Sequence, residues 1–343
     1  MYSDIRKEEK MNEEFRKKMR DVLLADYGLD INQAEFRFST QNYVYVFKNP
    51  PVIIRVSIRQ YRSREEMLSE MIWVDDLKQF KETICEPSPS LNGRLIEEFE
   101  IDGVRHRAGM FRAARGGVLD AKKYTPLFFI CIGDLVGTVH KVSTNERVLG
   151  MKFKRKKCDD IFTGLKQVSF PHLDSRMQDR INLTEEKVRN LPKEAGKYGL
   201  CHGDLHGNNF FVDANNIWLF DFDSSLYADY LFDVASLFLV VLLAGYKPEK
   251  NARAVLYEDM LPYFKIGYEL QKGTDGHYWD NLELFMSYRA AFVTMALTQI
   301  GENGISDTIE MARKAFALMV MEEDSLKALD VIRSQRKSRP AER

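Results

Sequence analysis

The chain has 343 residues, of which 45% are hydrophobic and 29% charged, and its 50 Lys and Arg side chains balance 51 Asp and Glu. This composition excludes a mainly disordered protein. The formal net charge of −1 disfavours a protein that binds nucleic acid by neutralising phosphates. The length suggests two domains or lobes.

The cysteines and the first residues indicate a cytoplasmic protein. No two of the four cysteines form a CxxC pair, which disfavours a zinc ribbon, and four cysteines are too few for a disulfide framework. Residues 1–20 are charged throughout and lack the apolar run of a secretory signal. The apolar run at 234–245 is shorter than the ~18–20 residues of a membrane span. We therefore expect no membrane and no nucleic-acid partner, and the oligomeric state does not follow from the sequence.

Apolar periodicity predicts a β-rich segment near the start of the chain. A helix is expected within residues 1–30, from apolar residues at helical spacing. The elements predicted next are strands around 36–38, 43–47 and 53–56, a turn at 49–51, a helix over 62–80, and strands around 95–99 and 109–113.

Helices dominate from about residue 126 onward. The predicted helices span 126–142, 174–190, 230–245, 253–271, 278–299 and 306–331, with one island of strand at 209–220. The basic run at 152–157 (KFKRKK) is interpreted as a solvated loop rather than a phosphate-binding patch, because it lacks a wider surround of interleaved aromatic and basic residues.

The residues that carry chemistry lie in one acidic stretch. Residues 199–246 contain six Asp and no Lys or Arg. Ionised carboxylates in an apolar sequence are costly unless they meet a cation, and their hard oxygen atoms suit Mg²⁺. The stretch therefore predicts a magnesium site.

A short hairpin is expected to assemble this site. If Val212 pairs with Ile217, Asn209 comes beside Asp221 at the open end of the hairpin. Asp204 lies in the loop five residues before Asn209. Local register is therefore predicted to bring Asp204, Asn209 and Asp221 to one point.

Three motifs in this order resemble those of the protein-kinase-like superfamily, in its aminoglycoside phosphotransferase and choline kinase branch. They are the loop at 202–209 (HGDLHGNN), the acidic motif at 221–223 (DFD) and the triplet at 233–235 (DVA). The resemblance extends over about residues 35–300. It implies an α+β, bilobal protein-kinase-like fold, with a small antiparallel-sheet N-lobe at 1–114, a larger and mainly helical C-lobe at 115–335, and a polar tail at 336–343.

The resemblance also implies a kinase reaction. The enzyme would use Mg²⁺ and move the γ-phosphoryl group of ATP or GTP to a hydroxyl group of a small molecule. Asp204 would be the catalytic base, and Asn209 and Asp221 would hold Mg²⁺. The supporting residues would be His202, His206, Asp223 and Asp233.

The resemblance places the nucleotide on the N-lobe. Arg55 would face the α/β-phosphates with Glu70 as its anionic partner, although Glu66 leaves the register open. The alternative is that Arg55 is a surface charge on an edge strand; the apolar residues around it favour function. The nucleobase is expected on the backbone at Phe111, Arg112 and Ala113. The sequence departs from the family where residues 39–42 (STQN) replace a glycine-rich loop. The chain has no GxxxxGK(S/T) motif either, which excludes a P-loop NTPase.

Two other functions are weighed against the kinase. The hexapeptide at 203–208 (GDLHGN) resembles a metallophosphoesterase motif, but the further His and Asp ligands of that class are missing from the sequence pattern. The absence of the glycine-rich loop favours an inactive pseudokinase, whereas the intact Asp204, Asn209 and Asp221 argue against one. His140 is expected to be a packed histidine. The aromatic residues Tyr227, Tyr230, Tyr278 and Trp279 line an acceptor pocket or belong to an aromatic core.

Overall fold

The computed structural model describes residues 13–38, 42–57, 62–118, 124–144, 154–192, 194, 196–245, 252–274 and 277–300. The chain divides into two units, each of which is built from separate segments. The first unit contains residues 1–118, 145–155 and 208–225, and the second contains 119–144, 156–207 and 226–343. The predicted helix at 306–331, the polar tail and the turn residues 39–41 lie outside the described residues.

This division differs from a single cut near residue 114. The hairpin at 208–225 belongs to the first unit because its backbone is hydrogen-bonded there. The amide of Val212 donates to the carbonyl of Gly117 at 2.9 Å, and the amide of Leu219 donates to the carbonyl of Thr83 at 3.0 Å. The functional lobes at 1–114 and 115–335 stay a prediction.

The first unit is built on an antiparallel sheet of six strands in the order β1-β2-β3-β6-β4, with β5 paired to β6. The strands are β1 (Glu35–Phe38), β2 (Asn42–Phe47), β3 (Val52–Ser57), β4 (Pro87–Ser88), β5 (Glu97–Ile101) and β6 (Val104–Arg112). The predicted order of three strands, one helix and further strands is confirmed. The two-residue strand β4 was not predicted.

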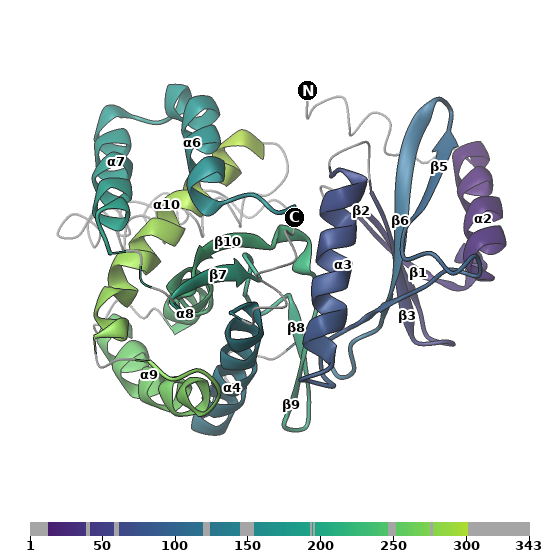
Figure 1. The fold of residues 1–343 in the computed structure, drawn as a ribbon. Helices are drawn as coiled ribbons and strands as arrows, with labels where there is room; N and C mark the ends of the chain where they lie inside the picture. The colour runs from purple at the N-terminus through teal and green to yellow at the C-terminus, as the bar shows by residue number, and fades with distance from the viewer. Residues whose placement is uncertain are drawn as a thin grey trace, which may run out of the picture. The chain divides into compact units, whose positions relative to one another are not determined.

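Two helices cover opposite faces of this sheet (Figure 1). Helix α2 (Glu13–Tyr27) is followed by the 3-10 turn η1 (Ile31–Gln33), and α3 (Arg64–Lys78) begins at the capping box of Ser63 and Glu66. Successive strand residues point to opposite faces. Ile54 packs in the core that α2 covers, so its neighbour Arg55 points toward α3.

The predicted hairpin forms in the first unit. It consists of β8 (Phe210–Asp213) and β9 (Asn216–Leu219), and Val212 pairs with Ile217 as predicted. The amide of Phe220 donates to the carbonyl of Asn209 at 3.1 Å, which extends the pairing toward Asp221. The 3-10 turn η4 (Phe222–Ser224) follows directly.

The second unit is mainly helical. Its helices are α4 (Pro126–Ser143), α6 (Cys158–Ser169), α7 (Ser175–Arg189), α8 (Leu231–Gly245), α9 (Ala252–Gln271) and α10 (Leu282–Ile300), with 3-10 turns η3 (Phe170–His172) and η5 (Tyr278–Asn281). The strands β7 (Tyr198–Cys201) and β10 (Leu226–Asp229) pair antiparallel among them. Five of these helices match the predicted ones, whereas α6 was not predicted.

Helices α4 and α9 cross at glycines. A Cβ on Gly133 would lie 2.2 Å from the carbonyl oxygen of Phe264, and one on Gly267 would lie 1.9 Å from that of Ile130. The two backbones therefore touch without an intervening side chain. In the part of the chain that the structure describes, α4 is the one helix long and apolar enough to cross a membrane; 67% of it is buried in the protein, as in a core helix, so it is weak evidence for a span.

Candidate active site

Arg55 forms a buried ion pair on the α3 face of the sheet. Its Nη2 atom donates to Oε2 of Glu70 at 2.7 Å, and the two side chains are 9% and 1% exposed. Glu70, rather than Glu66, is therefore the partner, because Glu66 instead closes the capping box of α3. Burial alone would lower the pKa of Arg55, but the charges of Glu70 and Asp223 raise it, so the cation persists.

Asp221 meets the same guanidinium from the hairpin. Its Oδ1 atom accepts a hydrogen bond from Nη1 of Arg55 at 3.4 Å, and its side chain is 51% exposed. The backbone of Asp221 has φ 63° and ψ 60°, a left-handed conformation that few residues other than glycine adopt. Asn209 is buried one residue outside β8, opposite Phe220. The first unit thus brings Arg55, Glu70, Asn209 and Asp221 together.

Asp223 is surrounded by donors. Its Oδ1 accepts from Nε of Arg62 at 3.3 Å, and its Oδ2 accepts from Nδ2 of Asn42 at 3.4 Å. Burial alone would raise the pKa of Asp223, but the positive charges of Arg55, Arg62 and Arg155 lower it. Asp223 is therefore an ionised, buried carboxylate that neutralises arginines, and its supporting role at a metal site stays a prediction.

The backbone predicted to hold a nucleobase is already paired in part. The amide of Arg112 donates to the carbonyl of Glu86 at 2.9 Å, and that of Ala113 donates to the carbonyl of Pro51 at 3.0 Å. The ring of Phe111 lies under the guanidinium of Arg55, 4.9 Å away. A nucleobase in this region would have to use polar groups other than these two amides.

In the second unit, Asp233 fixes the loop that follows β7. Its Oδ2 accepts from the amide of His202 at 2.6 Å, and its Oδ1 accepts from the amide of Gly203 at 2.8 Å. The Nδ1 atom of His202 accepts in turn from the amide of Asp204 at 3.3 Å. Gly203 has φ +84°, a conformation that a side chain would strain. These contacts are the kind that a supporting residue makes, and the supporting roles of Asp233 and His202 in a reaction stay predictions.

Both oxygen atoms of Asp204 have partners. Oδ1 accepts from Nη2 of Arg289 on α10 at 2.6 Å, and Oδ2 lies 3.2 Å from Nε2 of His206. Burial alone would raise the pKa of Asp204, but the hydrogen bond from His206 and the charge of Arg289 hold it well below its usual range. Asp204 is therefore an ionised carboxylate with a fixed orientation.

His140 is a packed histidine, as predicted. Its Nε2 lies 3.3 Å from Oδ2 of Asp233, and its Nδ1 lies 2.9 Å from the hydroxyl of Tyr268. His140, Cys201 and Asp233 are close enough to hold a metal ion, and among the described residues they form such a group. Since backbone amides and His140 already occupy the carboxylate of Asp233, hydrogen bonding accounts for the cluster.

Comparisons with known proteins add to this geometry. The sequence matches the phosphotransferase enzyme family over residues 32–256. The chain belongs to the phosphotransferase enzyme family.

Individual relatives agree with this membership. Amicoumacin kinase of Bacillus subtilis is 28% identical over 247 residues, which are 71% of this chain and 73% of that protein. The solved structure of an amicoumacin kinase in complex with AMP-PNP, Ca²⁺ and Ami has a TM-score of 0.76 and 19% sequence identity. The match covers 96% of this chain and 100% of that chain. A choline kinase from Cryptosporidium parvum has a TM-score of 0.61 and 13% sequence identity. The match covers 92% of this chain and 97% of that chain. The expected kinase-like α+β fold is confirmed.

Arginines that sequence reasoning missed lie against the acidic stretch of this phosphotransferase. Arg289 contacts Asp204, and Arg62 contacts Asp223, from positions distant in sequence. The inference that the carboxylates of 199–246 need a metal because no cation lies nearby in sequence is therefore too strong. Arg289 sits alone in an apolar helix, the same signal that singled out Arg55; Arg62 carries no such signal.

The aromatic residues proposed for an acceptor pocket are mostly core. Tyr230, Tyr278 and Trp279 are buried, whereas Tyr227 is half-buried. The rings of Tyr278 and Trp279 pack against Tyr268 at 6.2 and 5.3 Å. Tyr230, Tyr278 and Trp279 therefore belong to an aromatic core, which was the alternative interpretation.

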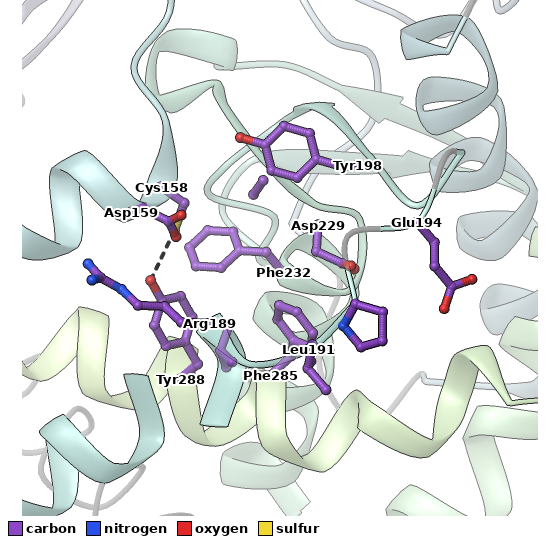
Figure 2. Close-up of a pocket in the computed structure, with 13 residues that line it drawn as sticks. Cys158, Asp159, Arg189, Leu191, Glu194, Tyr198, Asp229, Phe232, Phe285 and Tyr288 are labelled. Carbon is purple, nitrogen blue, oxygen red and sulfur yellow. Dashed lines mark hydrogen bonds between the residues drawn. The ribbon is translucent and has the colours of Figure 1, made fainter. Parts of the chain in front are cut away.

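A separate cavity of about 60 Å³ lies in the second unit (Figure 2). Tyr198 and Asp229, at one end of the β7–β10 pair, line it together with aromatic residues of α8 and α10. The loop that contains Asp204 begins at the other end of β7. Burial raises the pKa of Asp229 to about 6, and its Oδ1 accepts from the amide of Leu231 at 2.9 Å. This cavity is not part of the site around Asp204.

Proposed function

We propose that this phosphotransferase uses Mg²⁺ and moves the γ-phosphoryl group of ATP or GTP to a hydroxyl group of a small molecule. One observation carries the proposal: the buried guanidinium of Arg55 is bonded to Glu70 and to Asp221, which ties a phosphate-binding cation to a carboxylate suited to a metal. The proposal includes a cytoplasmic location, where both nucleotides are plentiful.

The residues present fit a divalent cation. Asn209 offers an amide oxygen and Asp221 a half-exposed carboxylate, and Mg²⁺ prefers such hard oxygen ligands. When bound, the metal would neutralise charge on the phosphates. Asp223 is not needed as a ligand, since Asn42 and Arg62 already occupy both of its oxygen atoms.

Asp204 is proposed to orient the acceptor hydroxyl rather than to hold its proton. A carboxylate whose pKa lies well below the usual range is a weak base. It can still accept a hydrogen bond from the hydroxyl and aim the oxygen at the phosphorus. Phosphoryl transfer depends more on the positioning of the acceptor oxygen than on abstraction of its proton, because the transition state is loose.

The relatives suggest which acceptors to test first. Their names point to amicoumacin and choline, both of them small molecules. We propose an acceptor of this class, with amicoumacin first because that relative matches in sequence as well as in fold.

A nucleotide-consumption screen tests the proposal. The purified protein is mixed with Mg²⁺ and either ATP or GTP, and amicoumacin, choline and aminoglycosides are added one at a time. Acceptor-stimulated release of ADP or GDP, with a phosphorylated product in the mass spectrum, is expected from the wild type and not from Asp204→Asn. Nucleotide binding without turnover on any acceptor would instead indicate a pseudokinase.

The metallophosphoesterase alternative has less support. That class needs His and Asp ligands around two metals, but the Asp of its motif, Asp204, is already bonded through both oxygen atoms, to Arg289 at 2.6 Å and to His206 at 3.2 Å. The motif at 203–208 also lies inside the segment that matches the phosphotransferase family.

A further inference from the structure

Arg155 belongs to the basic run at 152–157 but is buried. The residue is 8% exposed, whereas its neighbours Lys154, Lys156 and Lys157 are exposed. The prediction of a solvated loop is therefore wrong at Arg155. The physical reason is that its guanidinium has polar partners inside the first unit.

The guanidinium of Arg155 donates to four backbone carbonyls. Nε donates to the carbonyl of Ser225 at 2.8 Å, and Nη2 donates to that of Phe222 at 3.3 Å and to that of Asp223. Nη1 donates to the carbonyl of Glu66 at 3.2 Å. Arginine suits this task because its donors form a rigid planar fork, which a lysine does not have.

Packing alone does not explain this residue. Burial lowers the pKa of Arg155, which records the cost of placing a cation there, although the charges of Glu70 and Asp223 offset part of it. Apolar side chains often fill a buried site of this kind at lower cost than an ion does. What an apolar side chain cannot do is bind and orient carbonyl groups.

Three of the four carbonyls belong to the turn that directly follows Asp221. The left-handed backbone of Asp221 is unfavourable for a residue with a side chain, and such a conformation persists only where the surroundings enforce it. Arg155 bonds the carbonyls of the next two residues, and the ring of Phe222 packs edge-on against Trp73 of α3 at 5.3 Å. The turn is thus fixed both by the hydrogen bonds from Arg155 and by the packing of Phe222 on α3.

The fourth carbonyl belongs to α3. Beside it, the hydroxyl of Ser69 accepts from the amide of Lys154 at 3.0 Å. Glu70, the partner of Arg55, is the next residue on this helix. One arginine therefore connects the helix that holds Arg55 with the turn that follows Asp221.

We propose that Arg155 is a positioning residue, which holds the turn at 222–225 against α3 and so keeps the carboxylate of Asp221 in the orientation that binds the divalent cation of the nucleotide. This inference rests on the proposed function, because Asp221 is a metal ligand only there. Arg155 acts through the backbone and touches neither metal nor nucleotide.

The test compares nucleotide binding with and without metal. Calorimetry gives the affinities of ATP and of GTP, in Mg²⁺ and in EDTA, for the wild type, Arg155→Met, Arg155→Lys and the control Lys156→Met. Coupling between two ligands typically amounts to about 5–150-fold. We expect both Arg155 variants to lose most of the Mg²⁺-dependent gain while their metal-free affinity stays within about twofold. Lys156→Met should keep the gain.

The results below either support the positioning role of Arg155 or overturn it. Amide hydrogen exchange of the peptide at 221–225 should accelerate in the Arg155 variants and not in Lys156→Met. An unchanged metal gain in folded Arg155→Lys, or an equal loss with and without Mg²⁺, overturns the proposal. If Arg155→Met does not fold, the affinities of Arg155→Lys provide the test. If neither variant folds, Arg155 has a structural role and the proposal fails. If Mg²⁺ does not raise the nucleotide affinity of the wild type, the proposed function is contradicted instead. Hydrogen exchange at 221–225 then shows by itself whether Arg155 stabilises the turn.

Discussion

Asp204 illustrates how single contacts define a chemical role. Arg289 holds one of its oxygen atoms and His206 the other. In the proposed reaction, an acceptor hydroxyl would meet a carboxylate that is already fixed and ionised, so binding of the hydroxyl would not have to order it. This arrangement favours orientation over proton removal as the contribution of Asp204.

Replacement of Asp204 by Asn separates chemistry from nucleotide binding. Asparagine is isosteric, but it cannot accept hydrogen bonds through both terminal atoms and carries no charge. We expect Asp204→Asn to lower phosphoryl transfer by about 10²-fold, because the acceptor hydroxyl loses its orientation, and to leave nucleotide affinity within about twofold. Steady-state rates and nucleotide titration measure the two effects. Normal transfer by the folded variant would refute the role given to Asp204.

Replacement of Arg289 acts through the pKa of Asp204. The charge of Arg289 lowers this pKa, so Arg289→Gln should raise it toward the usual range. The carboxylate would then protonate at a higher pH, and the acid limb of the pH–rate profile should move upward. Arg289→Lys keeps the charge and should leave that limb closer to the wild-type position. Among the residues that the structure describes, His202, His206 and Arg289 act on the charge of Asp204. An acid limb that stays at the wild-type pH in Arg289→Gln would contradict this account.

Asp229, in the wall of the cavity in Figure 2, predicts a pH-dependent stability. Its pKa rises from 3.8 to about 6 on folding, so its protonated form favours the folded state below pH 3.8, and this contribution is lost as the pH rises through 6. An asparagine in its place would not ionise and would keep an oxygen for the amide of Leu231. Urea unfolding should show Asp229→Asn more stable than the wild type at pH 7.5, by at most about 3 kcal/mol, and nearly equal at pH 4. Equal stability at pH 7.5 would count against the raised pKa.

Among the elements, the hairpin β8–β9 shows what sequence can predict. Its register depends on a short turn and on alternating side chains, so the positions of Asn209 and Asp221 followed from residues within one short stretch. The strand position of Arg55 and the helix of Glu70 followed from periodicity in the same way, but the choice of Glu70 over Glu66 needed the helix start, which the capping box sets.

Contacts between distant segments could not be predicted. Arg289 reaches Asp204 across 85 residues of sequence, and Arg62 reaches Asp223 across 161. No local period encodes such pairs, because they depend on how whole elements pack. The burial of Arg155 could not be predicted for the same reason. Its neighbours in sequence are exposed, and only the tertiary structure distinguishes Arg155 from them.

Substitution by alanine is expected to have opposite effects at two helical glycines, Gly267 at the crossing of α4 and α9 and Gly164 on α6. A Cβ on Gly267 would lie 1.9 Å from the carbonyl oxygen of Ile130, which is backbone and cannot rotate away. Gly267→Ala should therefore destabilise the protein by about 1–3 kcal/mol, since the helices must separate. Gly164 on α6 has nothing within 4 Å of its Cβ position, and Gly164→Ala should stabilise by about 0.5–1 kcal/mol through helix propensity. Urea unfolding of both variants checks the pair, and a neutral Gly267→Ala would show that the helices can move apart freely.

On the scale of the whole molecule, the net charge of −1 hides two unlike arrangements. In the first unit, Arg55 and Arg62 meet Asp221 and Asp223. In the second unit, Arg289 meets Asp204. The proposed roles follow this division, because the nucleotide and the metal depend on residues of the first unit, whereas the acceptor depends on Asp204 in the second.

This division predicts which variants a nucleotide can stabilise. A ligand at about 100 times its Kd stabilises the state that binds it by about 2.7 kcal/mol. Mg²⁺ and nucleotide together should raise the Tm of the wild type and of Asp204→Asn by similar amounts, since Asp204 is not a nucleotide ligand. Asp221→Ala should lose the part of the shift that needs Mg²⁺ and keep the metal-free part. Comparison of thermal shifts in Mg²⁺ and in EDTA measures this, with ATP and GTP in parallel to identify the donor. If Asp204→Asn lost the Mg²⁺-dependent shift as fully as Asp221→Ala, the assignment of the metal to Asn209 and Asp221 would have to be abandoned, because Asp204 would then be a ligand as well.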